Sequence, residues 1–201
     1  MKPNPRKNPF VARLLAFAML SASLPSASGA NYTWDTVGGD GAAITPGSGD
    51  WNGVATNWNT GVSNVAWSGN NTAVFAGADG AYAINLASNF STNTVLLNFA
   101  NSGYEISASS PQSLTTSYSS STSTSNPASA TTSLIWVAAG KSATLGNNVT
   151  FNSTGTSYGV KIGLEDADSV LNVATGAKID KTSGSNRDLI FGGLGTVNVA
   201  G

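Results

Sequence analysis

The sequence predicts an all-β protein whose second half forms a solenoid of stacked, similar units. The strong helix formers Leu, Met and Glu are sparse, whereas Val, Thr, Ser, Asn and Gly are abundant, which favours strands and turns. Short apolar runs alternate with Gly-, Asn- and Ser-containing turns, as in all-β folds. The segment Leu171–Ala174 also recurs as Val197–Ala200, 26 residues later. Repetition at such a period is typical of solenoids.

The composition limits the chemistry that the chain can perform. Its 201 residues suggest one domain,, and 40% hydrophobic residues are enough for a core, although only 9% are charged. Cysteine and histidine are both absent. This excludes disulfides, thiolate metal sites, His-ligated zinc, and catalytic groups of the Ser-His-Asp and Cys-His types.

Positive charge is concentrated at the N-terminus. Lys2, Arg6, Lys7 and Arg13 precede a stretch without any Lys or Arg up to Lys141. Without residues 1–30, five basic and ten acidic residues remain, a net charge of −5. Nucleic-acid binding needs clustered Lys and Arg, so we expect no nucleic-acid partner.

Residues 1–30 have the pattern of a secretory signal peptide. The basic segment is followed by the apolar run Leu14–Leu20 and by small residues that place Ser28 and Ala30 at positions −3 and −1 of a cleavage site,. An N-terminal membrane anchor is the alternative, but the run is far shorter than the ~20 residues that span a bilayer. We therefore expect cleavage before Asn31, no later transmembrane segment, and a secreted or cell-surface protein.

Residues 31–106 contain an aromatic motif followed by short strands. The motif holds Trp51, Trp58 and Trp67 in a stretch without charge between Asp50 and Asp79. These rings could form a sugar-stacking platform, or a hydrophobic cap that closes a β core while Asn52 and Asn57 satisfy turn amides; the cap is the preferred interpretation. The expected strands are Tyr32–Asp35, Thr72–Ala76, Tyr82–Leu86, Thr94–Phe99 and Tyr104–Ser107.

A polar segment separates these strands from the second half. In residues 107–133, 18 of 27 residues are Ser or Thr and none is charged. Such a segment cannot bury enough apolar surface to offset its ordering entropy, so it is predicted to be an exposed loop. Residues 134–201 are predicted to form solenoid rungs, and looser echoes there relate Lys161–Leu164 to Phe191–Leu194 and Val137–Gly140 to Val173–Gly176.

Together these segments resemble the N-terminal passenger region of bacterial autotransporter-associated β-strand repeat proteins. The resemblance rests on four motifs, which are Trp51/Gly53/Asn57/Trp58, Asn71–Gly77, Leu97–Phe99 with Gly103–Ile106, and Val137–Gly140 through Leu145. It implies a right-handed parallel β-helix that forms an extracellular passenger or surface stalk. The family's repeat is incomplete in this chain, where Gly195–Gly201 matches its first half, and the family offers no agreed catalytic residues.

Two sets of acidic residues are candidate sites. Glu165, Asp166 and Asp168 could bind calcium at a turn, because hard cations take carboxylate oxygens, but a solvated turn is the preferred interpretation and no cofactor is expected. A polysaccharide-cleaving enzyme would need two carboxylates at a set separation, and Asp166 or Asp168 with Asp180 or Asp188 are the candidates, with Arg187 as a basic neighbour. No spacing singles out a pair.

The sequence thus favours an exported structural or adhesin-like β-solenoid with a Trp-rich cap and no catalysis of its own. The alternatives are a carbohydrate-binding module that uses exposed Trp51, Trp58 and Trp67 and, third, a polysaccharide-cleaving β-helix enzyme. The expected partners are extracellular polysaccharides or cell-surface components. A competing architecture is an N-terminal β-sandwich over residues 31–106, followed by solenoid rungs.

Overall fold

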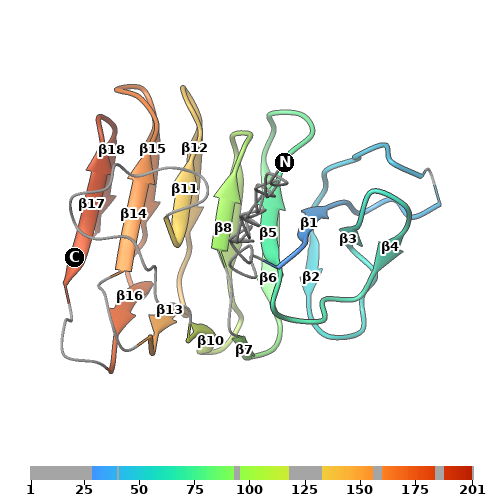
Figure 1. Cartoon of the computed structure of the whole chain (residues 1–201), viewed down its shortest axis with the longest axis horizontal. Coiled ribbons are helices and arrows are strands. Elements are labelled where there is room, and N and C mark those ends of the chain that lie inside the picture. The colour runs from blue at the N-terminus through green and yellow to red at the C-terminus, as the bar shows by residue number, and fades with distance from the viewer. Residues whose placement is uncertain are drawn as a thin grey trace, which may run out of the picture.

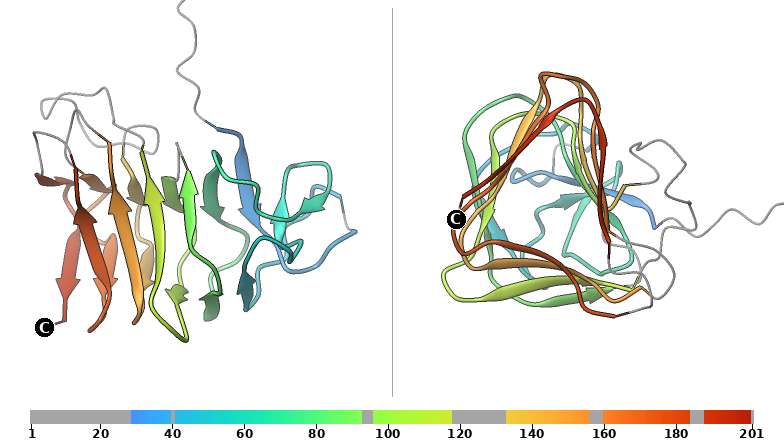
Figure 2. Two further views of the ribbon diagram at one scale, coloured as in Figure 1. Left: turned by 90° about the horizontal axis from the view of Figure 1, so that it is seen from below. Right: turned by 90° about the vertical axis from the view of Figure 1, so that its left-hand side faces the viewer.

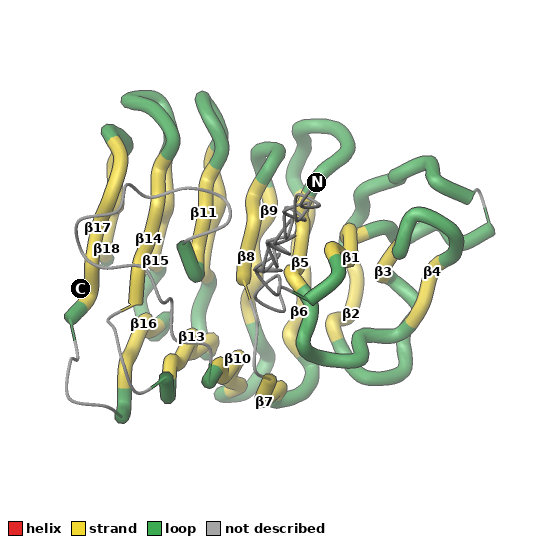
Figure 3. Tube along the Cα trace, in the orientation of Figure 1, coloured by secondary structure: helices red, strands yellow, loops and turns green. Residues whose placement is uncertain are grey.

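The computed structural model describes residues 29–39, 41–92, 96–117, 133–155, 160–183 and 188–200. These residues form 18 β-strands and no helix (Figure 3). Accordingly, this part of the chain contains no helix long and apolar enough to cross a membrane. The predicted signal segment up to residue 28 lies outside the described residues. The all-β prediction is confirmed.

The strands form three sheets, named A, B and C here. Sheet A has the order β17-β14-β11-β8-β5-β1-β3-β4 and contains β1 (Asn31–Trp34), β3 (Trp58–Asn59), β4 (Asn64–Val65), β5 (Thr72–Phe75), β8 (Leu96–Phe99), β11 (Ile135–Val137), β14 (Val160–Leu164) and β17 (Leu189–Gly193). Sheet B has the order β18-β15-β12-β9-β6-β2 and contains β2 (Gly49–Trp51), β6 (Tyr82–Leu86), β9 (Tyr104–Ser107), β12 (Ser142–Leu145), β15 (Val170–Val173) and β18 (Thr196–Val199). Sheet C has the order β16-β13-β10-β7 and contains β7 (Phe90–Thr92), β10 (Gln112–Thr116), β13 (Val149–Ser153) and β16 (Lys178–Lys181).

From β5 onward the chain visits sheets A, B and C in turn and then starts again. Each strand pairs in parallel with the strand three places later, as in β5–β8, β6–β9 and β10–β13. We call one such circuit a rung. The rungs comprise residues 72–92, 96–116, 135–153 and 160–181, and a fifth, residues 189–199, has strands in sheets A and B only. Viewed along the stack, the three sheets enclose the interior like the sides of a triangle (Figure 2, right).

Alternate residues of every rung point into this interior and stack on their equivalents in the next rung. In sheet A, Phe75 pairs with Phe99 in register, and their rings stack at 4.8 Å with 16° between their planes. In sheet B, Ile84 and Ile106 occupy equivalent, fully buried positions. The apolar residues of all the complete rungs form one continuous core. In the predicted strand Thr94–Phe99, Leu97 and Phe99 are both fully buried.

The internal repeats correspond in part to the observed register. Leu171 and Val173 of β15 pair with Val197 and Val199 of β18, so the 26-residue repeat relates neighbouring rungs. The predicted match of Lys161–Leu164 to Phe191–Leu194 is wrong by one residue, because Ile162 pairs with Phe191 rather than with Gly192. The predicted match of Val137–Gly140 to Val173–Gly176 relates strands of different sheets, β11 and β15. What those two segments share is a corner turn.

Gly140 and Gly176 adopt φ angles of 64° and 81° at these corner turns. Such left-handed φ values favour glycine over residues with a Cβ atom. The match of Val137–Gly140 to Val173–Gly176 therefore reflects the local geometry of a turn that follows a strand, not the stacking of rungs.

The predicted Ser/Thr loop begins later than expected. Within residues 107–133, strand β10 pairs on one side with β7 and on the other with β13. Leu114 and Thr116 of this strand are fully buried. A strand in a stacked sheet needs an apolar residue only at alternate positions, and Thr has a high strand propensity. The polar composition of this segment is therefore compatible with a strand. Residues 118–132 lie outside the described residues.

The alternative of an N-terminal β-sandwich is wrong. Sandwich sheets of that kind are antiparallel, whereas β5, β6 and β7 pair in parallel with strands of the second rung. Strand β8, before the polar segment, also pairs in parallel with β11, after it. Residues 72–116 and 135–199 are therefore parts of the same three sheets.

The two ends of the stack differ. At the N-terminal end, β3 and β4 join sheet A in antiparallel orientation, and the core there contains Trp34, Trp51, Trp58 and Trp67. At the other end, β16, β17 and β18 are the last strands of their sheets. Figure 1 shows this contrast, with the irregular cap at one end and the regular rungs at the other.

Candidate functional site

The tryptophan motif forms the centre of the cap. Trp34 ends β1, Trp51 ends β2 and Trp58 begins β3. Trp34, Trp51 and Trp58 are fully buried, and Trp67 is 4% exposed. The ring centroids of Trp51, Trp58 and Trp67 lie 4.6–5.0 Å apart in tilted or edge-to-face arrangements. Offset and edge-to-face contacts are the favourable geometries for aromatic pairs.

This burial contradicts the premise that Trp51, Trp58 and Trp67 form an exposed glycan-stacking platform. A stacking platform needs an open ring face, and these rings instead contact one another and the first-rung residues Phe75 and Phe90. Large aromatic residues occur at these positions because their side chains fill the end of the core. The hydrophobic-cap interpretation accounts for all three.

The indole N–H groups of the cluster have unequal partners. Trp34 Nε1 donates to the carbonyl oxygen of Gly47 at 2.8 Å. The Nε1 atoms of Trp51, Trp58 and Trp67 are buried and have no hydrogen-bond partner among the described residues. Trp51 meets both Trp58 and Trp67 edge to face, and such aromatic contacts are favourable.

A buried carboxylate, which the sequence analysis missed, organises the cap loops. Asp35 is fully buried and accepts hydrogen bonds from the backbone N–H of Val37 at 3.1 Å and of Thr45 at 3.2 Å. It also accepts from Asn59 Nδ2 at 3.0 Å. The position of Asp35 directly after a strand was the one indication in the sequence that this carboxylate is buried. Its partner Asn59 is 24 residues away and could not be identified from the sequence.

The two asparagines expected to satisfy turn amides behave differently. Asn52 Oδ1 accepts from the N–H of Val54 at 2.8 Å and of Ala55 at 2.7 Å, as expected. Asn57 instead donates from Nδ2 to the carbonyl oxygen of Asp50 at 3.2 Å. Both asparagines fix the loop that joins Trp51 to Trp58, and they are used in folding rather than presented to a ligand.

A second polar group lies at the corner between sheets A and B. Asp79, in the first rung, accepts from Ser102 N at 2.9 Å and from Asn101 Nδ2 at 2.8 Å in the second rung. Lys141 Nζ of the third rung lies 2.9 Å from Asp79 Oδ2. These bonds, led by the one from the Ser102 amide, lower the pKa of Asp79 to about 2. One carboxylate thus ties three rungs together.

The acidic cluster of the fourth rung, considered above for calcium, occupies the same corner. Asp166 Oδ1 accepts from Gly140 N at 2.9 Å and lies 2.8 Å from Ser169 Oγ, while Glu165 Oε2 accepts from Ala139 N at 3.0 Å. The bond from Gly140 is the main reason that the pKa of Asp166 is lowered. Both carboxylates bind amides of the preceding rung, which is a structural use.

The arrangement of metal-ligating residues can be followed throughout the described ranges, the acidic turn included. No group of three or more Asp or Glu side chains is placed there to hold an ion. The weak calcium hypothesis for Glu165, Asp166 and Asp168 therefore gains no geometric support.

The carboxylates considered for polysaccharide cleavage lie on different parts of the fold. Asp166 and Asp168 follow β14 at the corner between sheets A and B, whereas Asp180 lies in β16 of sheet C, and Asp188 precedes β17. Cleavage of a glycosidic bond needs two carboxyl groups about 5–10 Å apart across one substrate site. Arg187 lies outside the described residues.

Comparison with known protein families, with curated proteins and with solved structures found no match for this chain.

Proposed function

We propose that this protein is an exported structural or adhesin-like β-solenoid, a right-handed parallel β-helix with a tryptophan cap and no catalysis of its own. The observation that carries the proposal is the continuous parallel register from β5 to β18, in which every complete rung adds one strand to each sheet. Such a stack is a stiff body in which length and surface area grow with every rung. Its role is to extend and present a surface.

The use of polar side chains supports a structural role. Asp35, Asp79 and Asp166 each accept hydrogen bonds from backbone amides or from neighbouring rungs. Polar residues inside the stack, such as Thr116 and Ser153, are equivalent positions of adjacent strands. These groups stabilise the coil instead of converging on a shared hollow.

Three further arguments support the remaining parts of the proposal. Parallel strands joined within one sheet almost always follow a right-handed path, which favours a right-handed coil. The N-terminal segment with Ser28 and Ala30 favours export. The resemblance to autotransporter-associated repeat proteins favours display at or release from a bacterial surface.

The outer faces are where a partner would make contact. Sheet C presents outward columns of short polar side chains, such as Thr115 and Asn152, which pair in register. In sheet B, Asn198 Nδ2 donates to Asn172 Oδ1 at 3.0 Å along a similar column. Flat arrays of hydroxyl and amide groups suit contact with extracellular polysaccharides or cell-surface components through many weak hydrogen bonds.

The experiment that tests the proposal incubates the full chain with a panel of soluble and insoluble polysaccharides. Three readouts are followed: released reducing ends or unsaturated products, retention on insoluble glycan, and tryptophan emission. We expect no product, and blue-shifted emission that no glycan changes, because the indoles are buried. Trp58→Ala should lower the melting temperature without altering retention.

Product release that survives purification would overturn the non-catalytic assignment. A glycan-dependent emission shift that disappears in Trp58→Ala would restore the binding-module hypothesis. Export is tested separately by mass spectrometry of the secreted protein, which should begin at Asn31.

A further inference from the structure

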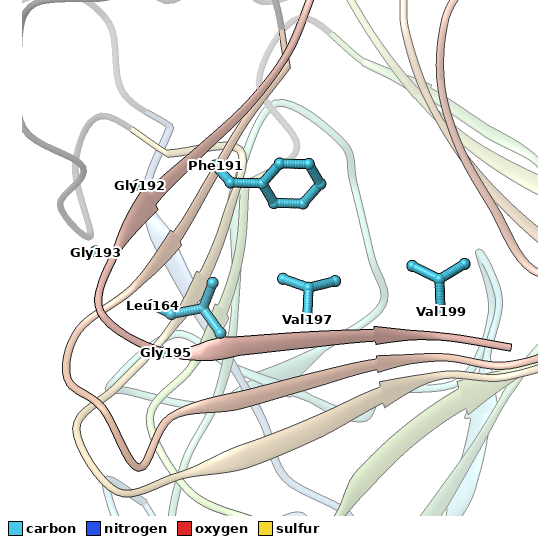
Figure 4. Close-up of a pocket in the computed structure, with 7 residues that line it drawn as sticks. All are labelled: Leu164, Phe191, Gly192, Gly193, Gly195, Val197 and Val199. Atoms are coloured by element: carbon cyan, nitrogen blue, oxygen red, sulfur yellow. The ribbon is translucent and has the colours of Figure 1, made fainter.

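A small hollow lies on the outer face of sheet B, beside the cap. Its volume is about 190 Å³, and it is lined by Ser48, Ala81, Tyr82, Ala83, Gly103 and Glu105. A larger hollow of about 340 Å³ beside β17 and β18 is filled from one side by the apolar residues Phe191, Val197 and Val199 (Figure 4). The hollow on sheet B lies instead between the cap and the second rung, so the described chain borders it on both sides, and its rim is polar.

The hollow exists because one outward side chain of the first rung is small. The outward residues at one register position of successive sheet B strands are Ala83, Glu105, Thr144 and Asn172. Only Ala83 lacks a side chain beyond the β-carbon. On the cap side, the register of β2 with β6 places Ser48 opposite Ala83. Ala83 is therefore the floor of a gap between Ser48 and Glu105, whose backbones lie about 10 Å apart, which is two strand spacings.

Two polar groups on the rim have unused hydrogen-bonding capacity. Ser48 Oγ accepts from the backbone N–H of Ala83 at 2.9 Å, and the proton of the hydroxyl is free to be donated. The Glu105 carboxylate makes no hydrogen bond or ion pair within the described residues, where the one ion pair joins Lys141 to Asp79. The rim thus offers a hydroxyl donor and a negatively charged acceptor.

The position of the Glu105 carboxylate is set by a glycine of the third rung. A Cβ atom built on Gly146 would lie 2.7 Å from Glu105 Oε1. The glycine therefore leaves the space over which the Glu105 side chain extends. Its aliphatic stem forms one wall of the hollow, and its charge stands at the rim on the side of the third rung.

The surroundings of the hollow are acidic. Asp50, two residues after Ser48, is exposed, and its Oδ1 accepts from Asn85 Nδ2 at 2.8 Å. No Lys or Arg occurs between Arg13 and Lys141, so the cap and the first two rungs lack basic residues. Complementary charge steers and orients a partner, which favours an occupant with positive charge.

We propose that the hollow binds one unit of an extracellular polysaccharide whose sugars carry free amino groups. The inference rests on the proposed function, in which extracellular polysaccharides are partners. The sugar ring lies over the Ala83 methyl group, one of its oxygen atoms accepts from Ser48, and its ammonium group meets Glu105. A lysine side chain would supply the charge but no acceptor for the Ser48 proton.

The size of the hollow suits one unit of a longer chain. Its volume is below the ~300–1,000 Å³ of sites that enclose a drug-sized ligand. Beyond the hollow, Thr144 and Asn172 continue the Glu105 register position at intervals of ~4.8 Å,. A polysaccharide that lies along the stack therefore has polar side chains to contact on both sides of the bound unit.

The test is isothermal titration calorimetry of the full chain with soluble chitosan oligosaccharides, whose sugar units carry free amino groups. Chitin oligosaccharides have the same backbone with acetylated, uncharged nitrogen atoms and serve as the matched ligand. At mildly acidic pH, where the amino groups are protonated, we expect saturable binding of chitosan oligosaccharides and about tenfold weaker binding of chitin oligosaccharides. Added salt should reduce this difference, because the charges are exposed.

Two pairs of variants locate the site. Glu105→Gln removes the charge and should lower the affinity for chitosan oligosaccharides about tenfold, whereas Asp168→Asn, which removes an exposed charge in the fourth rung, should not. Ala83→Leu fills the hollow and should abolish binding, whereas Thr150→Leu, on the outward side of β13, should not. Thermal unfolding should show that all four variants are folded.

Four results would overturn the proposal. They are no heat of binding at the highest ligand concentration, equal affinities for the chitosan and chitin oligosaccharides, binding that survives Ala83→Leu, and tighter binding of polylysine that Glu105→Gln abolishes. The last result would assign the hollow to a basic protein segment. Released sugar products would instead overturn the non-catalytic function, and they are measured separately as reducing ends, so the two failures are distinguishable.

Discussion

At the scale of single residues, Gly163 shows how the outer face of sheet A constrains the sequence. A Cβ atom built on Gly163 would lie 2.6 Å from Trp136 Cζ3, closer still to Cε3 of the same ring, and 2.6 Å from Ser133 Oγ. Trp136 is the register neighbour of Gly163 in the preceding strand, and it is 8% exposed. The glycine is required because it makes room for the indole.

We therefore expect Gly163→Ala to lower the free energy of unfolding by about 1–3 kcal/mol, the usual effect of overpacking. Its control is Gly53→Ala, because a Cβ atom on Gly53 meets nothing within 4 Å, and exposed substitutions of this kind change stability by about 0.5 kcal/mol or less. Urea unfolding of both variants measures the difference. Equal stabilities would show that Trp136 moves freely away from Gly163.

Asp79 gives a residue-scale prediction about pH. Its pKa is lowered from the ordinary 3.8 to about 2, so the folded state favours the charged carboxylate. The charged Asp79 carboxylate therefore stabilises the fold in full at any pH above the ordinary pKa. This stabilisation is lost as the pH falls through the lowered pKa of the folded protein. Asp79→Asn should therefore lower the melting temperature near neutral pH, and the difference from the wild type should shrink between pH about 4 and about 2.

The control for this measurement is Asp168→Asn, since the Asp168 side chain makes no hydrogen bond among the described residues. Its melting temperature should follow that of the wild type across the same pH range. A difference for Asp79→Asn that stays constant down to pH about 2 would contradict the assigned role of the charge.

At the scale of elements, β10 is the least expected strand. It lies in a segment of Ser and Thr, yet Leu114 pairs in register with Phe90 on one side and with Phe151 on the other. The strand fills sheet C between β7 and β13. Its hydroxyl residues Ser113 and Thr115 point outward, so polarity and strand formation do not conflict.

Leu114→Ala should destabilise the protein by about 2–5 kcal/mol, the usual cost of truncating a buried leucine. Thr115→Ala, its outward neighbour, should change the stability by about 0.5 kcal/mol or less. Chemical unfolding of the two variants measures the difference in their free energies of unfolding. Two equally stable variants would mean that the segment is a dispensable loop after all.

At the scale of the whole molecule, the stack is sealed at one end and open at the other. Each inner rung is covered on both sides, whereas β17 and β18 are covered on one side only. In proteins built from stacked units, stability is approximately a sum of unit and neighbour contributions. The units at an open end therefore have the least support.

Hydrogen exchange should show this asymmetry. Amides of β8 and β11 should exchange slowest and those of β17 and β18 fastest. Mass spectrometry of peptides from each rung measures the gradient. Uniform exchange rates along the stack would show that the chain opens only as a whole.

Local features of the fold were predictable from the sequence. Strands Tyr82–Leu86 and Tyr104–Ser107 have the predicted bounds, because alternating apolar residues and Gly-containing turns define a strand locally. The 26-residue repeat likewise matches a neighbouring pair of strands. The tryptophan motif was identified, and its preferred interpretation as a cap agrees with the burial of all three rings.

Features that join distant parts of the chain were not predictable. Asp35 with Asn59 and Asp79 with Lys141 are separated by 24 and 62 residues, and a single sequence does not show which polar residues will meet. Strand β7 was missed because Phe90–Thr92 is too short to show a pattern without its neighbour β10.

The sequence by itself determined that this protein is all-β, that its units repeat, and that histidine- and cysteine-dependent chemistry is excluded, because these follow from composition and from local alternation. Only the tertiary structure decided which strands pair, that the tryptophans are buried, and that one end of the stack is open. Those properties depend on register between segments far apart in the chain. A shift of one residue would exchange the inward and outward faces, and only the packed structure fixes that choice.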